Sequence, residues 1–317
     1  MDRSTAVVAV ALALLTSAAA PLPAPAAGTV PAAVPDGEIR AVRVVKGPEV
    51  DGRLDDEAWR SVPAVTGFRM VEPRPGDEPS EPTEARVLYD DHSLYIGVLC
   101  RDSEPARIAA NTMAHDNGGG GGGYGGYGYG HRMSSTSSDD LVRVLLDPFQ
   151  DKRNAYVFFV NPRGARGEGL AYAGDSSLNW DGIWEARSHR SEDGWSAEIR
   201  IPFKTISFRP GLSVWGLNIE RTIARKMEVI RLSGTTLDAN FNNPSEAAAL
   251  QGIEGVKQGR GITFRPYGLA SAARDNLVSP DYKGGLDGGF DLYKSFTPNL
   301  VGVVSYNMDF AETEVDE

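Results

Sequence analysis

The residues best suited to hold a ligand lie in a short polar turn around a tryptophan. Asn179, Trp180 and Asp181 follow one another, and Trp184 stands four positions after the first indole. If a strand follows Gly182, positions 180 and 184 share a parity, because side chains alternate along a strand. A flat indole can cover the apolar side of a sugar ring while amides and carboxylates bond its hydroxyl groups. The turn therefore indicates carbohydrate binding rather than catalysis.

The same residues also have a structural interpretation. Trp184 lies inside a predicted strand and is better explained as a core residue, whereas Trp180 fits a core role and a ligand contact equally well. Arg153, in the turn after Asp147, could reach sugar hydroxyls or simply be solvated. The predicted carbohydrate-binding set is therefore Trp180, Asn179, Asp181, Trp184 and Arg153.

A calcium site is the one cofactor for which the sequence offers ligands. Asp147, Asp151 and Asn154 fall within one turn and provide the oxygen atoms that Ca²⁺ prefers. Side chains of these types also form ordinary Asx turns, which is the interpretation we favour. Calcium therefore stays an option and not a requirement.

The sequence does not predict catalytic residues. Glycoside hydrolysis needs two carboxylates facing each other across a cleft, and the sequence does not bring any two of its acids together. The four histidines are scattered without metal-ligand spacing, and neither a Gly-x-Ser-x-Gly nor a His-Glu-x-x-His motif occurs.

The elements that must position these residues are short strands separated by turns. Alternating apolar residues and Asp, Asn, Gly or Pro turns predict hairpins and further strands at residues 83–100, 141–160, 182–201, 214–220 and 229–232. Asp55 is expected to cap a helical turn that carries Ala58 and Trp59 inward. Paired strands at short, regular spacing with few helical stretches predict an all-β sandwich.

Composition excludes some partners. The net charge of −11 repels phosphate backbones and argues against nucleic acid. The single cysteine, Cys100, cannot form an intrachain disulfide and is expected to be buried.

The N-terminus predicts export. Residues 1–26 combine Arg3, an apolar stretch at 6–15 and the small-x-small end Ala24-Pro25-Ala26, as in a cleaved signal peptide. The alternative is an uncleaved anchor. Residues 27–38 are rich in proline and alanine and are expected to form a linker.

Two further segments differ in composition from the predicted sandwich. Residues 117–131 are rich in glycine and tyrosine and are expected to form a mobile loop without the signature of a P-loop. Residues 256–317 hold extended segments with alternating apolar positions, joined at Thr297-Pro298. This pattern fits both the first strands of an outer-membrane β-barrel and an exposed hairpin. Two or three strands cannot close a barrel, so the first interpretation makes the chain a fragment.

Several segments carry a family resemblance. They are VDGRLDDEAW (50–59), RVLYDDHSLYIGVLCRDSEP (86–105), DDLVRVLLDPFQDKRNAYVFFVNPRG (139–164), NWDGIWEA (179–186), DGWSAEIRIPF (193–203) and WGLNIER (215–221). Together they resemble the carbohydrate-binding module family 9-like domain over residues 39–225. The tail at 251–267 and 288–317 resembles the junction in a bacterial family of unknown function that fuses this module to a C-terminal outer-membrane β-barrel, which favours the barrel interpretation.

The resemblance implies a jelly-roll-like antiparallel β-sandwich at 39–255, followed by the first strands of an incomplete barrel at 256–317. Family 9 modules are attached to xylan-degrading enzymes, clamp a sugar ring between two tryptophans and hold structural calcium. The implied function is a non-catalytic carbohydrate-binding module of an exported cell-envelope protein, in the periplasm or outer membrane of a Gram-negative-type bacterium. It would serve polysaccharide binding or breakdown.

Two alternatives stay open. The sandwich could be a periplasmic scaffold or plug of a barrel protein with no sugar site. The chain could also be an enzyme associated with glycoside hydrolases, because the family is linked to hydrolysis of O-glycosyl compounds.

Overall fold

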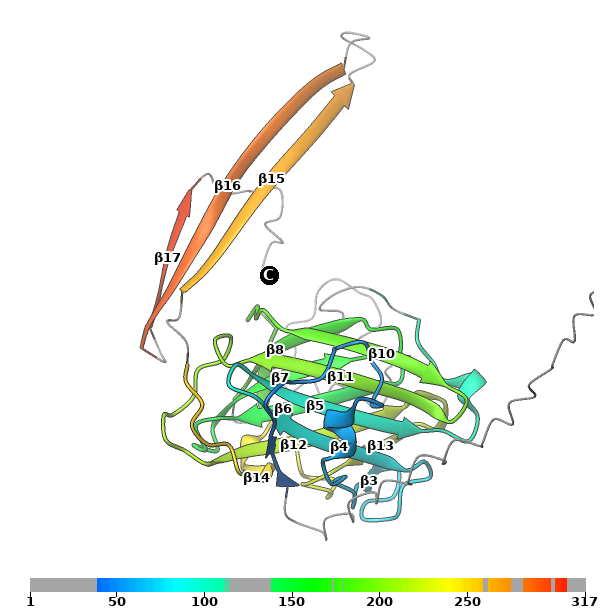
Figure 1. Cartoon of the computed structure of the whole chain (residues 1–317). Helices are drawn as coiled ribbons and strands as arrows, with labels where there is room; N and C mark the ends of the chain where they lie inside the picture. The colour runs from blue at the N-terminus through cyan, green and yellow to red at the C-terminus, as the bar shows by residue number, and fades with distance from the viewer. Residues whose placement is uncertain are drawn as a thin grey trace, which may run out of the picture.

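The computed structural model describes residues 39–111, 113, 138–172, 174–178, 180–258, 262–274, 282–297 and 300–306. The predicted signal peptide (1–26), the linker up to residue 38 and the glycine-rich loop (117–131) lie outside the described residues. So does Asn179. The described strands form three sheets, of which two stack as a sandwich (Figure 1).

The larger layer of the sandwich is a sheet of nine strands. Its main path runs through β1 (Ile39–Arg40), β14 (Ala248–Gln251), β12 (Val214–Ile223), β6 (Leu141–Asp147), β7 (Asn154–Val160), β8 (Arg166–Tyr172) and β9 (Asp175–Ser177). Two more strands extend it beside β12, namely β13 (Glu228–Arg231) and β3 (Arg69–Glu72). The neighbours along the path are antiparallel except for β1 and β14, which are parallel.

The second layer has five strands. Their order is β10 (Glu185–Ser191), β11 (Gly194–Pro202), β5 (Ser93–Arg101), β4 (Thr83–Tyr89) and β2 (Val42–Arg43). The short helical elements are α1 (Glu57–Arg60), η1 (Pro105–Arg107), η2 (Ala224–Lys226) and η3 (Pro244–Glu246). Among the described residues, no helix has the length and apolar character that crossing a membrane requires. The all-β sandwich predicted from the sequence is confirmed.

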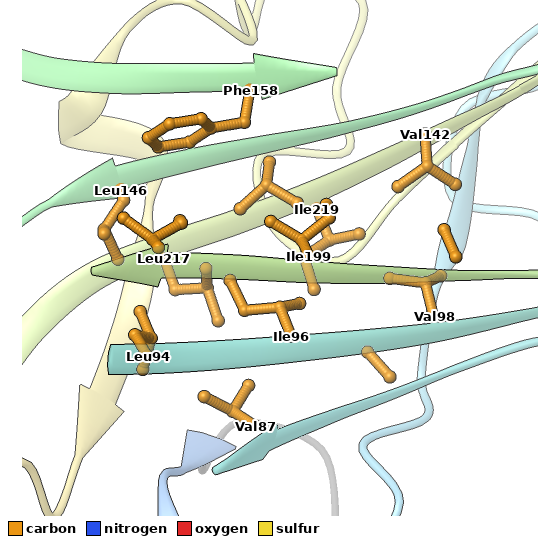
Figure 2. Packing of buried hydrophobic residues seen from close by; sticks show 14 of the residues in the cluster. Val87, Leu94, Ile96, Val98, Val142, Leu146, Phe158, Ile199, Leu217 and Ile219 are labelled. Atoms are coloured by element: carbon orange, nitrogen blue, oxygen red, sulfur yellow. The ribbon is translucent and has the colours of Figure 1, made fainter. Parts of the chain in front are cut away.

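The core lies between the two sheets. Alternate residues of each strand point inward, so that Ile96 and Ile199 from the smaller sheet meet Leu217 and Ile219 from the larger one (Figure 2). Side chains of opposite parity face outward from both layers. Cys100 is fully buried in this core and is a free thiol, as expected.

A chain segment covers the outer face of the smaller sheet. The helical turn α1 places Trp59 over Gly97, where a side chain of any size would meet the indole and Leu54. The outward-facing Glu198 accepts a hydrogen bond from Trp59 Nε1. The helical turn begins after Asp56 and not after Asp55 as predicted, and Asp56 makes no side-chain cap.

Charged residues are buried on the outer face of the larger sheet. Glu220 on β12 accepts hydrogen bonds from Arg143 on β6 and Arg231 on β13, at 2.9 and 2.6 Å. Phe241 covers the Arg143 guanidinium, 4.3 Å from the ring centroid. The ions are thus paired inside the protein, as burial of charge requires.

The third sheet contains β15 (Ile262–Arg274), β16 (Tyr282–Thr297) and β17 (Leu300–Tyr306), all antiparallel. It extends away from the sandwich (orange and red in Figure 1). The register puts Phe264, Phe290 and Tyr306 on one face, with ring centroids 5.3 and 5.7 Å apart. Arg265 and Asp291 lie opposite each other on the other face.

Candidate functional site

The predicted binding turn lies on the inner face of the larger sheet, over β7 and β8. Gly182 N donates a hydrogen bond to Glu168 Oε1 on β8, at 3.2 Å. Trp180 packs against Tyr156 and Phe158 of β7, with ring centroids 4.7 and 5.9 Å away. A larger residue at Gly182 would displace the Trp180 indole, because a Cβ there would lie 2.5 Å from its ring.

The two tryptophans of the turn differ in exposure. Trp180 is half-buried and packs at the margin of the core. Trp184 is only 3% exposed; the Phe158 ring lies nearly perpendicular to it, with centroids 5.0 Å apart, and the Arg166 guanidinium lies 5.5 Å from its ring centroid. Trp180 can therefore offer a ring to a ligand, whereas Trp184 supports the sheet beneath it.

Exposed apolar side chains continue the surface along β8. Leu170 and Tyr172 are 37% and 43% exposed. Leu170 pairs with Tyr156, and Tyr172 pairs with Asn154, so both project from the same sheet face as the residues under Trp180. We call Tyr156, Leu170, Tyr172 and Trp180 the aromatic platform.

Polar groups border the aromatic platform. The edge strand β9 brings Ser177 opposite Leu170 and Asp175 opposite Tyr172, so both are on the platform face. Asp181 follows Trp180 directly, and its side chain is 65% exposed. Asp181 Oδ2 accepts a hydrogen bond from Arg265 Nη1 of β15, at 2.8 Å. A ring-stacking surface thus adjoins oxygen acceptors, which is the combination that a sugar requires.

The sequence also matches a family model. Residues 50–247 fit the model described as carbohydrate family 9 binding domain-like. The chain belongs to this family. No curated protein matches the chain.

Among solved structures, the family 9 domain is similar to a family 9 carbohydrate-binding module from Caldicellulosiruptor kristjanssonii. The structure of that module in complex with cellotriose is 15% identical, with a TM-score of 0.44, and the match covers 68% of this chain and 92% of that one. The structure of that module in complex with glucose is 16% identical, also with a TM-score of 0.44, and covers 69% and 98%.

The remaining predicted residues of the family 9 domain lie at the β6–β7 turn. Asp147 is buried and accepts hydrogen bonds from the backbone N–H groups of Phe149 and Lys152. Asp151 accepts from the backbone N–H groups of Arg153 and Asn154, and from Asn154 Nδ2 at 3.0 Å. These are Asx-turn contacts.

The pKa values of the two carboxyl groups of that turn shift in opposite directions. Burial raises the pKa of Asp147. Burial also acts to raise the pKa of Asp151, but the hydrogen bonds from Asn154 and Arg153 outweigh it and lower that pKa. Within the part of the chain that the structure describes, no three His, Cys, Asp or Glu residues gather as a metal site. The calcium option stays a prediction.

The platform strand β8 was not predicted from the sequence. Its residues RGEGLAY contain two glycines, an arginine and a glutamate, so they lack the apolar alternation of a half-buried strand. The alternate positions 166, 168, 170 and 172 do share a face, and Leu170 and Tyr172 at its end were the available signal. The turn residue Arg153 is exposed and adjoins Asn154, which lies across from Tyr172.

Proposed function

We propose that the family 9 domain is a non-catalytic carbohydrate-binding module that holds a sugar ring on the aromatic platform. The observation that supports this most directly is the exposure of Leu170 and Tyr172 on the sheet face where the half-buried Trp180 packs against Tyr156. Isolated exposed apolar residues are ordinary, but adjacent ones next to an indole in a sandwich mark a candidate ligand surface.

Each group has a defined task in this proposal. Trp180 stacks on the ring, and Tyr172 supplies a second aromatic surface with a phenol that can bond a hydroxyl group. Asp181, Asp175 and Ser177 accept or donate hydrogen bonds at the border of the platform. Arg153 and Asn179, which were predicted with them, complete the proposed polar set.

The test is a titration with soluble oligosaccharides of the cello-, xylo- and chito- series, cellotriose among them. Trp180→Ala should weaken binding by at least about tenfold, equivalent to roughly 1.4 kcal/mol, since a central aromatic contact is lost. Tyr172→Ala should weaken it less, and Trp180→Phe should keep part of the affinity. Met227→Ala, at an exposed residue of the turn after η2, is the matched control.

The titration and an assay for reducing sugars distinguish the role of Trp180, carbohydrate binding as such and enzymatic activity. Equal affinity of the wild type and Trp180→Ala would remove Trp180 from the site. Failure of every oligosaccharide to bind the wild type would remove carbohydrate binding for the sugars of the panel. Release of reducing sugars by the purified chain would favour the alternative of an enzyme associated with polysaccharide breakdown.

We also propose that the protein is exported to the cell envelope of a Gram-negative-type bacterium and that its C-terminal region begins an outer-membrane barrel. The signal-like residues 1–26 support export. The separation of Phe264, Phe290 and Tyr306 from Arg265 and Asp291 on opposite sheet faces supports the barrel, because membrane strands alternate between lipid and interior. N-terminal sequencing of the mature protein and fractionation of membranes test both points.

A second candidate function is a scaffold or plug without a sugar site. The contact between Asp181 and Arg265 favours it, because it attaches the sandwich to the third sheet at the predicted binding turn. A sandwich fragment that folds and shows no affinity for any glycan would support this alternative.

A further inference from the structure

The chain that leaves the sandwich is fastened along the side where the aromatic platform lies. After β14, Ile253 is fully buried in the core and Val256 packs against it. Gln258 Nε2 donates to Ser207 Oγ at 3.1 Å, and Ser207 N donates to the hydroxyl of Tyr156 at 3.0 Å. We call residues 253–258 the strap. Because Tyr156 belongs to the platform, the strap is linked to the proposed site through Ser207 before β15 starts.

The third sheet contacts the sandwich at Asp181, the residue that follows Trp180 of the platform. Arg265, four residues into the thirteen-residue strand β15, binds Asp181 beside Trp180. The side chains of Arg265 and Asp181 are 35% and 65% exposed, so the pair is open to solvent. Ion pairs of this kind are weak and reversible, since water and salt compete with them.

Arg265 has another carboxylate within reach. Asp291 on β16 stands directly opposite Arg265 in the antiparallel pairing, on the same face of the third sheet. Opposite charges at paired positions attract each other across a sheet. A guanidinium displaced from Asp181 would therefore keep a partner in its own sheet.

We propose that Arg265 and the ligand compete for Asp181, so that occupancy of the aromatic platform releases the third sheet from the sandwich. The inference rests on the proposed carbohydrate site, which needs Asp181 as a hydrogen-bond acceptor. Coupling of this kind is reciprocal: the factor by which bound ligand weakens the Arg265–Asp181 contact is also the factor by which that contact weakens ligand binding. Binding of a glycan to the sandwich would in this way free the C-terminal sheet to move.

The first measurement is the affinity of the full chain, in detergent, for the oligosaccharide of the panel that binds the wild type best. Arg265→Gln should bind roughly two- to fivefold more tightly, the range expected for loss of one exposed competing ion pair. Arg60→Gln is the matched control, because Arg60 is an exposed arginine at the end of α1 on the outer side of the smaller sheet. It should bind like the wild type.

The second measurement follows the third sheet directly. Spin labels at Glu192→Cys, in the β10–β11 turn, and at Ser305→Cys, on β17, report the distance between sandwich and sheet; the native Cys100 is buried and should not label. Ligand should broaden the distance distribution of this doubly labelled chain. Adding Arg265→Gln should broaden it without ligand, and Arg60→Gln should not.

Two results would overturn the inference while leaving the carbohydrate site intact. One is an Arg265→Gln affinity equal to or weaker than that of Arg60→Gln, and the other is a distance distribution that ligand does not change. Absence of binding to the wild type by the whole panel would instead overturn the proposed function, and this inference with it.

Discussion

At the scale of single residues, Glu198 shows how one side chain organises a segment far away in the sequence. It accepts hydrogen bonds from Trp59 Nε1 and Gly52 N, both at 2.6 Å, and from Asp51 N at 2.9 Å. Burial raises its pKa to about 7, although these hydrogen bonds favour the ionised form. The segment from Asp51 to Trp59, part of the family pattern, is thus held by a carboxyl on β11.

The raised pKa of Glu198 predicts a pH-dependent stability. A carboxyl whose pKa rises from 4.5 to about 7 on folding stabilises the folded state fully below pH 4.5, and this contribution is lost as the pH rises through 7. The free energy of unfolding of the wild type, relative to Glu198→Gln, should therefore fall by up to about 3 kcal/mol between pH 4.5 and 8.

Urea unfolding at several pH values measures this difference. The control is Glu49→Gln, since Glu49 is an exposed carboxyl. A difference that increases with pH would contradict the prediction. It would show that the hydrogen-bond donors keep Glu198 ionised in the folded protein.

The candidate site could be predicted only in part at this scale. The composition around Trp180 indicated a ring and polar neighbours, and the structure places Trp180 half-buried and Asp181 exposed at the surface. Tyr172 and Leu170 were not foreseen, because the sequence of β8 lacks regular apolar alternation and their exposure depends on tertiary packing. Trp184, in contrast, is buried, because Phe158 and Arg166 pack against it.

At the scale of elements, the buried charges link three neighbouring strands of the larger sheet. Glu220 on β12 bonds Arg143 on β6 and Arg231 on β13, and the side chains of all three are 6% exposed. A buried ion pair contributes little net stability when intact, but removal of one partner leaves the other charge unpaired in a low-dielectric environment.

Glu220→Gln should therefore lower the free energy of unfolding by about 3–5 kcal/mol, measured by chemical denaturation. The control is Glu185→Gln, which removes an exposed carboxylate 3.3 Å from Arg200 and should cost about 1 kcal/mol or less. Similar losses of unfolding free energy in the two variants would show that burial does not make the Glu220 ion pairs more important than an exposed pair.

The strands followed from the sequence where burial imposed a simple pattern. The hairpins β4–β5, β6–β7 and β10–β11 have apolar alternation and clear turns, and they were predicted. The strands β3, β8, β9 and β14 were missed. Strand β9 has only three residues and β14 pairs with β12 and β1 from distant parts of the chain, so local patterns could not reveal them.

At the scale of the whole molecule, the strap predicts where the sandwich ends. A fragment of residues 39–258 keeps the buried Ile253, the packing of Val256 and the bond from Gln258 to Ser207, and it should unfold in one cooperative transition. A fragment of residues 39–251 loses them and should be less stable by about 2–5 kcal/mol, as for truncation of a large buried side chain.

Thermal and denaturant unfolding of the two fragments test this boundary, which lies three residues beyond the predicted end at 255. Equal stability of the two fragments would show that the strap is not part of the folded unit. Titration of the longer fragment with the oligosaccharide panel would also show whether the sandwich binds sugar without the third sheet.

The sequence by itself determined that the chain is built of strands, that Cys100 forms no internal disulfide and that the segment around Trp180 combines an indole with polar groups. These properties follow from composition and short-range alternation, which act through neighbouring residues. Only the tertiary structure decided which side chains remain open, since that depends on strand register and on how far one sheet covers the other. The aromatic platform joins side chains of two strands and a turn, and the contact of Arg265 with Asp181 joins residues 84 positions apart, so neither arrangement follows from a local pattern alone.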